Sequence, residues 1–258
     1  MTDTHEVTVT SVHQMTPTVK QFLLEADGYT FEFDPGQHTH VHFDRSESPA
    51  ADDESGDEDD TSADEDGEVV RPYTATAMPG SERITLAIKR YPDGTASTWM
   101  HERTPGDTIE IEELGGNLYL RDLDSDVAFV STGTGITPMI AMAKQYVREG
   151  TGHAHFFFGE KDEEHIIYRE TLDQMAADNP DFDVTYVLSE ADDEWSGREG
   201  HVQDHLADAL DDLDGRDCYV CGVPQMVVDT QDYLDERGVP EANVYVEGWE
   251  GDEVSEEG

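Results

Sequence analysis

The sequence predicts two domains, a half-buried antiparallel β-sheet or β-barrel followed by a doubly wound parallel α/β sheet. Its 258 residues suffice for two modest domains. Over the first ~120 residues apolar and polar residues alternate, which is the period of half-buried strands. From about residue 123, compact apolar strands alternate with helical patterns, which indicates a parallel sheet covered by helices. We therefore expect domains at 1–122 and 123–250 and an acidic tail at 251–258.

Short alternating segments define the strands of the first domain. They are centred on Val7 and Val9, Phe22 and Leu24, Phe31 and Phe33, 84–88, and Ile109 and Ile111. The stretch 46–68 holds 12 acidic residues and no Lys or Arg, so it has almost nothing to bury. We expect a disordered or solvated acidic insertion between two strands; an acidic loop that binds a metal or a partner is the alternative.

The second domain shows strands and helices in alternation. Strands are expected at 127–130, 154–158, 184–188, 218–221 and 244–246. Helices are expected at 138–148, 163–177, 202–210 and 224–237. The last of these helices begins with Pro224 and is followed by Gly238, the usual order of these residues at helix ends.

The charge and cysteine content exclude several classes of protein. There are 15 Lys and Arg residues against 61 acidic residues, a formal net charge of −46. A nucleic-acid partner or an anionic membrane surface would be repelled. No apolar run approaches the roughly 18 residues of a membrane helix, so no membrane insertion is expected. Two cysteines exclude a disulfide scaffold and any four-cysteine iron–sulfur cluster.

The same acidity predicts a folded protein that works at molar salt. Periodic apolar segments argue against disorder, and at about 1 M salt the screening length is only ~3 Å, so self-repulsion is tolerable. An ordinary acidic protein is the alternative. The N-terminus lacks a basic start followed by an apolar stretch, so we expect no signal peptide and a cytoplasmic location.

The strongest local motif is the segment STGTGITP at 131–138, directly after an apolar strand. Its glycines allow a tight turn and close backbone approach, Thr137 can cap the following helix, and Pro138 suits its first turn. Free N–H groups and the helix dipole then favour a pyrophosphate. Pro138 stands where a dinucleotide fingerprint has its third glycine, and a plain turn is the alternative.

Two further segments have the chemistry of phosphate and ring binding. RPYT at 71–74 offers a guanidinium, a flat ring and a hydroxyl, although for this tetrapeptide taken alone a generic strand is the better explanation. DGTAS at 93–97 leads into a short helix, where Ser97 is either part of an anion cradle or a plain cap.

Cysteines and histidines supply no convincing metal or redox centre. Cys218 and Cys221 lie three apart in a strand, ~10 Å apart on opposite faces, beyond the reach of a disulfide. Zinc would need a second pair, so a functional Cys221 at the strand end beside Gly222 is the better interpretation. His38, His40 and His42 share a strand face, but we assign no metal there.

Taken in order, these motifs resemble the ferredoxin–NAD(P)+ reductase family of flavoenzymes over nearly the whole chain. PGQ at 35–37 resembles the family's turn before a barrel strand, RPYT its flavin motif, and DGTAS its flavin-phosphate segment. The stretches 106–120, 133–138 and 156–172 resemble the barrel closure, the nucleotide loop and the next strand and helix. Cys221-Gly222, with Met226, resembles the motif beside the nicotinamide.

The resemblance implies that the first domain is an antiparallel Greek-key β-barrel that binds flavin, and it implies a role for individual residues. Arg71 would bind a flavin phosphate, Tyr73 would pack along the isoalloxazine, and Thr74 would hydrogen-bond near N5. Thr74 and Cys221 would be the catalytic residues. The cofactor-binding set would be Arg71, Pro72, Tyr73, Thr74, Gly94, Thr95, Ala96, Ser97, Thr132, Gly133, Thr134, Gly135, Thr137, Pro138, Ser189, Cys221, Gly222 and Trp249. Trp249 would cover the second flavin face, although an acidic tail follows it and Val223 stands where the family has Pro.

The implied activity is transfer of a hydride from NADH or NADPH to bound FAD, followed by delivery of electrons to a separate protein such as ferredoxin. Glu190, after the strand at 184–188, favours NADH, whereas Arg198 could serve the extra phosphate of NADPH. A flavin reductase that releases its flavin, a reductase subunit of a larger redox complex and a non-catalytic acidic adaptor are the alternatives. Oligomeric state stays open between a monomer and such a subunit.

Overall fold

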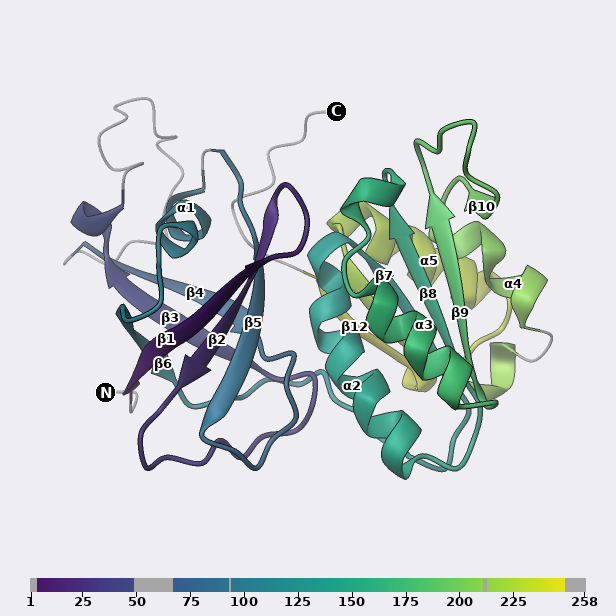
Figure 1. Ribbon diagram of the computed structural model, residues 1–258. Coiled ribbons are helices and arrows are strands. Elements are labelled where there is room, and N and C mark those ends of the chain that lie inside the picture. The colour runs from purple at the N-terminus through teal and green to yellow at the C-terminus, as the bar shows by residue number, and fades with distance from the viewer. Residues whose placement is uncertain (1–3, 49–66, 93, 211–212, 249–258) are drawn as a thin grey trace. The chain divides into compact units, whose positions relative to one another are not determined.

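The computed structural model describes residues 4–48, 67–92, 94–210 and 213–248 (Figure 1). The chain divides into two compact units between Asn117 and Leu118. Most of the acidic insertion, 49–66, and the acidic tail lie outside the described residues, so the expectations about them stay predictions.

The first unit is a six-stranded antiparallel sheet, as the alternating pattern predicts. Its strands are β1 (Thr4–Gln14), β2 (Val19–Glu25), β3 (His38–Asp44), β4 (Glu68–Thr74), β5 (Arg83–Lys89) and β6 (Thr108–Glu112). They lie side by side in the order β4-β3-β6-β1-β2-β5. Ala75, just beyond β4, bridges Leu86 of β5, so the two edge strands meet and the sheet curls into a barrel.

Alternation along each strand places one set of side chains in the barrel core. Val7, Val9, Phe22 and Leu24 are fully buried there, and the short helix α1 (Thr95–His101) adds Trp99 and Met100 to the same interior. The expected strand around Phe31 and Phe33 is wrong. Phe31 makes a single bridge to Ser81, and its ring is held by burial in the core.

The second unit is a six-stranded parallel sheet with helices on both faces, as predicted. Its strands are β7 (Val127–Thr132), β8 (Ala154–Glu160), β9 (Phe182–Leu188), β10 (Arg198–Glu199), β11 (Asp217–Gly222) and β12 (Val244–Gly248), in the order β10-β9-β8-β7-β11-β12. The helices are α2 (Ile136–Glu149), α3 (Arg169–Asp178), α4 (Leu206–Ala209) and α5 (Pro224–Glu236). In Figure 1, α2 and α3 lie in front of the strands, and α5 lies behind them.

Three helix predictions need correction. Helix α2 begins at Ile136, two residues earlier than expected. The expected helix at 163–177 is a 3₁₀ turn, η4 (Glu163–His165), followed by α3; Tyr168 between them has the left-handed φ of 58°, which no continuous helix accommodates. The expected helix at 202–210 is the 3₁₀ segment η5 (Val202–His205) followed by the single turn α4.

None of the described helices has the length and apolar character needed to cross a membrane.

Candidate functional site

The loop that follows β7 is a tight turn that leads directly into a helix. Gly133 begins a 3₁₀ turn, η3 (Gly133–Gly135), with φ of +55°, a region that favours glycine. Helix α2 follows at once, so its first N–H groups, which lack acceptors within the helix, and its dipole face the loop. The predicted cap is wrong: Thr137 Oγ1 donates to the carbonyl oxygen of Thr134 at 2.9 Å, and Gly135 occupies the cap position.

The end of β11 packs directly against this loop. A Cβ on Gly135 would clash with the carbonyl oxygen of Cys221. One on Gly222 would clash with the hydroxyl of Thr132 and lie 2.5 Å from Cε of Met226. The N–H of Val223 also donates to Thr132 Oγ1 at 3.3 Å. The structure thus brings together the two predicted nucleotide segments, at the carboxyl ends of neighbouring parallel strands, where open α/β sheets bind ligands.

Cys221 takes part in this junction through its backbone. Its side chain is 1% exposed, and burial raises the pKa of its thiol far above the ordinary range. A reactive thiolate at this position is therefore disfavoured, and the expected direct role of the Cys221 side chain finds no support in its position. Cys218 is also buried, and neither cysteine forms a disulfide, as expected.

The end of β8 lies beside the loop, and the end of β9 is bonded to the end of β8. Ser189 follows β9 and is exposed, and its N–H donates to the carbonyl oxygen of Glu160 at 3.0 Å. Glu160 is a residue that the motif analysis missed. Its Oε1 lies 4.0 Å from the position a Cβ on Gly133 would take. A carboxylate that ends the strand after a glycine-rich loop was the available signal.

The predicted flavin residues of the first unit lie on β4, with two of them on one face. Tyr73 and Arg71 alternate with Thr74, so Tyr73 and Arg71 share a side of the strand. Tyr73 packs partly against the barrel core, Arg71 is half-buried, and Thr74 is buried. The guanidinium of Arg71 donates to the carbonyl oxygen of Val70 at 3.0 Å.

The PGQ turn at 35–37 is hydrogen-bonded to the residue that follows β4. The N–H of Gln37 donates to the carbonyl oxygen of Asp34 at 3.0 Å, and the Gln37 side chain donates to that of Gly116 at 3.1 Å. The carbonyl oxygen of Gln37 accepts the N–H of Ala75 at 3.2 Å. The turn therefore holds the residue that follows Thr74 in place.

The predicted phosphate segment forms the start of α1, which packs against β4 and β5. Ser97 is 2% exposed and is not a plain cap, because its hydroxyl accepts the N–H of Tyr91 at 3.1 Å and donates to the carbonyl oxygen of Gly94 at 3.3 Å. A Cβ on Gly94 would lie 2.5 Å from Ser97 Oγ, so a larger residue at position 94 would displace the Ser97 hydroxyl. Ser97 shapes the turn, and the N–H groups of Thr95 to Ser97 begin the helix.

These two sets of groups fit the two cofactors that the motifs imply. Backbone N–H groups at the start of α1 lie beside β4, the strand that carries Arg71, which is the arrangement that the motifs imply for a flavin diphosphate. At the start of α2, the backbone cradle formed where Gly135 and Gly222 meet neighbouring strands suits a nucleotide diphosphate. Trp249, the proposed second cover of the flavin, lies outside the described residues.

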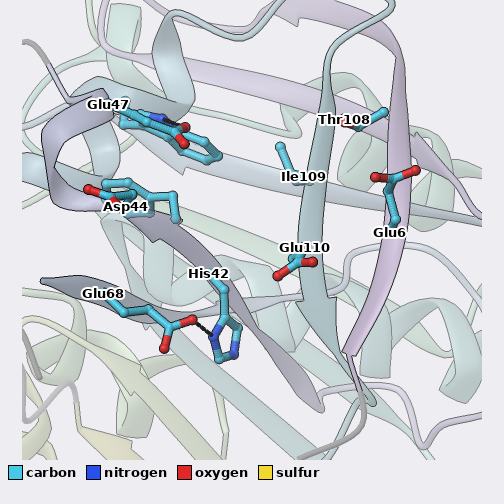
Figure 2. Close-up of a pocket in the computed structure, with 10 residues that line it drawn as sticks. Glu6, His42, Asp44, Glu47, Glu68, Thr108, Ile109 and Glu110 are labelled. Carbon is cyan, nitrogen blue, oxygen red and sulfur yellow. Dashed lines mark hydrogen bonds and ion pairs between the residues drawn. The ribbon is translucent and has the colours of Figure 1, made fainter. Parts of the chain in front are cut away.

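A separate hollow of about 350 Å³ in the first unit has the opposite character (Figure 2). Its lining includes the carboxylates of Glu6, Asp44, Glu47, Glu68 and Glu110. Figure 2 shows Glu68 turned toward His42, whose ring nitrogen lies 3.0 Å from the carboxylate. Five carboxylates disfavour an anionic diphosphate, so this hollow is not the flavin site.

Family models match both units. The oxidoreductase FAD-binding domain matches residues 60–119, and the oxidoreductase NAD-binding domain matches residues 129–232. These ranges contain the RPYT and DGTAS segments and the 133–138 loop, respectively.

Curated proteins with similar sequences are reductases and electron transfer components. Ferredoxin–NADP reductase B of Sorangium cellulosum (strain So ce56) is 31% identical over 257 residues, covering 95% of this chain and 97% of its own length. The ferredoxin reductase component of 3-ketosteroid-9-alpha-monooxygenase from Mycolicibacterium smegmatis is 29% identical over 70% of this chain. The chain spans 50% of that relative's length and 52% of the electron transfer component of anthranilate 1,2-dioxygenase from Acinetobacter baylyi.

Solved structures share the fold. A ferredoxin NADP+ reductase from Neisseria gonorrhoeae with bound FAD and NADP has a TM-score of 0.76 at 17% identity, covering 96% of this chain and 99% of that one. The FAD/NAD-binding domain of a nitric oxide dioxygenase from Vibrio cholerae gives 0.82 at 17% identity, covering 95% and 98%. With its FAD-binding and NAD-binding domains and a relative alike over almost its full length, the chain belongs to the ferredoxin–NADP reductase family of oxidoreductases.

Proposed function

We propose that this protein oxidises NADH or NADPH and delivers the electrons singly to a separate carrier protein of the ferredoxin type. The observation that carries the proposal is the junction of Gly135 and Gly222 at the carboxyl ends of β7 and β11, in a chain that also carries the flavin segment of the family. FAD, when bound, supplies the hydride-accepting and one-electron chemistry.

The chain's own residues would bind and orient the FAD and the nicotinamide nucleotide. The guanidinium of Arg71 and the N–H groups of Thr95, Ala96 and Ser97 would hold the flavin diphosphate, and Tyr73 would pack against the ring. Thr74 would offer its hydroxyl, and Pro72 would fix the backbone between them. The start of α2, from Thr132 to Pro138, would hold the nucleotide diphosphate, and Gly222 would leave room for the nicotinamide. No side chain needs to act as acid, base or nucleophile.

The low cysteine content indicates that the electrons pass to a separate acceptor protein. With two cysteines in the whole sequence, the chain cannot ligate a four-cysteine cluster of its own. The relatives named as reductase components of dioxygenase and monooxygenase systems also support delivery to another protein. Their names favour a second candidate, in which this chain is the reductase subunit of a larger redox complex.

The test is an anaerobic assay with purified protein, NADH or NADPH, and a ferredoxin from the same organism. We expect the ferredoxin to be reduced, with flavin retained through gel filtration. If free flavin is reduced while ferredoxin is not, and flavin separates from the protein on the column, the protein is a flavin reductase and the proposal fails. Co-purification of a cluster-bearing partner would identify the subunit of a complex.

We also infer that the protein works at high ionic strength. A net charge of −46 on 258 residues supports this inference, because 15 Lys and Arg residues can neutralise only a minority of the 61 acidic side chains. Screening is then needed to limit repulsion within each unit.

A further inference from the structure

A carboxylate stands at the entrance of the nucleotide loop. Glu160 is the last residue of β8, the strand beside β7. One of its carboxylate oxygens accepts the N–H of Lys161 at 3.2 Å, and the other, Oε1, lies 4.0 Å from the position a Cβ on Gly133 would take. A negatively charged oxygen therefore faces the first residue of the loop.

Backbone hydrogen bonds fix the chain at Glu160 and Lys161. The N–H of Ser189 donates to the carbonyl oxygen of Glu160 at 3.0 Å, and the N–H of Glu190 donates to that of Lys161 at 2.7 Å. These bonds tie the ends of β8 and β9 together. Glu190, which the sequence suggested as the nucleotide selector, is exposed and follows β9, one strand farther from β7.

The chemistry of Glu160 suits a ribose and not a phosphate. A carboxylate accepts hydrogen bonds from hydroxyl groups and repels a further phosphate. In βαβ nucleotide units, an acidic residue about 20 residues after the glycine loop, at the end of the second strand, accepts a ribose hydroxyl. Glu160 comes 27 positions after Gly133, at the end of the second strand of this unit.

Arg198, the cation that could attract the 2′-phosphate of NADPH, already interacts with neighbouring side chains. Its guanidinium donates to Asp208 at 3.2 Å and lies 3.2 Å from a ring nitrogen of His205. The ion pair with Asp208 offsets part of the Arg198 charge, which weakens the attraction of Arg198 for a phosphate.

We propose that Glu160 is a specificity-determining residue that admits the unmodified ribose of NADH and disfavours the 2′-phosphate of NADPH. The inference rests on the proposed function, because it requires the loop at 133–135 to bind a nucleotide diphosphate. It differs from the selection by Glu190 that the sequence suggested.

The test measures equilibrium binding of ADP-ribose and 2′-phospho-ADP-ribose by titration calorimetry, since neither ligand can reduce a flavin. Wild type is compared with Glu160→Gln, Glu190→Gln and Glu236→Gln, at the lowest salt concentration that preserves the circular dichroism spectrum. Glu236, exposed at the far end of α5, is the matched control that removes the same charge. Steady-state kinetics with NADH and NADPH follow as a second readout.

We expect wild type to prefer ADP-ribose, and Glu160→Gln to reduce the ratio of the two dissociation constants about tenfold. KM for NADPH should fall with kcat unchanged. The two other variants should keep the wild-type ratio. An unchanged ratio in Glu160→Gln, or an equal change in Glu190→Gln or Glu236→Gln, overturns the inference. If wild type binds neither ligand, the proposed function itself fails and this inference with it.

Discussion

Gly135 is the residue where the nucleotide loop has least room. Its missing side chain lets the loop touch the carbonyl oxygen of Cys221, a backbone group that cannot move without disturbing β11. We expect Gly135→Ala to destabilise the second unit by roughly 1–3 kcal/mol and to weaken binding of ADP-ribose at least tenfold. Thermal unfolding and titration calorimetry measure the two effects.

Gly215→Ala is the matched control for this substitution. Gly215 lies in the same unit, with no atom within 4 Å of its Cβ position. Its melting temperature and ligand affinity should stay at the wild-type values. A Gly135→Ala protein that behaves like this control would contradict the assigned loop geometry.

His155 is a second residue with a measurable consequence. Burial lowers the pKa of its imidazole to about 4, and its ring stacks on Phe157 with centroids 4.1 Å apart. Because the pKa is lower in the folded than in the unfolded protein, the unfolded state binds more protons below about pH 6.5. Stability should therefore fall as the pH drops from about 6.5 to 4, by on the order of 3 kcal/mol from this residue alone.

His155→Gln isolates that contribution, because glutamine does not titrate and can keep the hydrogen bond that His155 Nε2 makes with Thr185 Oγ1 at 2.8 Å. Chemical unfolding of both proteins at pH 7 and pH 4.5 is the measurement. The variant should lose less stability than wild type over this interval. Equal losses would show that carboxylates alone set the acid sensitivity.

At single positions, the sequence predicted which residues meet but not how their side chains point. Gly133, Gly135 and Gly222 could be found because glycine marks a tight turn or a close approach. The burial of the Cys221 thiol could not, since strand alternation does not say which face a helix will cover. Glu160 had a sequence signal as the carboxylate that ends the next strand, but its distance to Gly133 depends on the pairing of β7 with β8, which no local motif contains.

At the scale of elements, the contact between strands β3 and β6, here called the seam, has few backbone-paired residues and is reinforced by side-chain contacts. Only Val41–Ile111 and His42–Glu110 pair in register there, with a further bridge from His38 to Gly115. Glu112 adds contacts across the seam, with His40 Nδ1 and His42 Nε2 each 2.9 Å from its carboxylate. Burial alone would lower the pKa of His42, but hydrogen bonds to Glu68 and Glu112 outweigh it and raise the pKa.

The raised pKa fixes the direction of the pH effect. The stabilising contribution is complete below about pH 6.5 and is lost as the pH rises through the higher folded-state value. Glu112→Gln should therefore lower the melting temperature at pH 6 by a few degrees and flatten its change between pH 6 and pH 9. Glu32→Gln, an exposed control in the same unit, should keep the wild-type profile. A Glu112→Gln profile as steep as that of wild type would contradict the role of the seam.

Most helices and strands could be predicted because the hydrophobic periodicity of each segment and the turn residues at its ends indicate the same type of element. The strands of both sheets have clear alternation or compact apolar runs, and the order of strand and helix gave the parallel sheet. The region 163–177 failed because the left-handed conformation of Tyr168 is not visible in a helical pattern. The region 202–210 failed because Val202 and Leu206 can be buried equally well from a 3₁₀ turn followed by one α turn.

For the whole molecule, net charge predicts a dependence on salt. At about 0.1 M salt the screening length is ~10 Å, against ~3 Å at 1 M, so repulsion among 61 acidic residues grows as salt is removed. Dialysis from multimolar to low salt should abolish the far-UV circular dichroism of the folded state, and restoring salt should return it. An unchanged spectrum in low salt would show that the fold does not need salt, so that the negative charge serves solubility alone.

The most direct test of the central claim is the visible absorption spectrum of the protein purified in multimolar salt, recorded before and after anaerobic addition of NADH. The account predicts a bound flavin spectrum that bleaches when NADH is added. A colourless protein that neither binds added FAD nor oxidises NADH in its presence would contradict it.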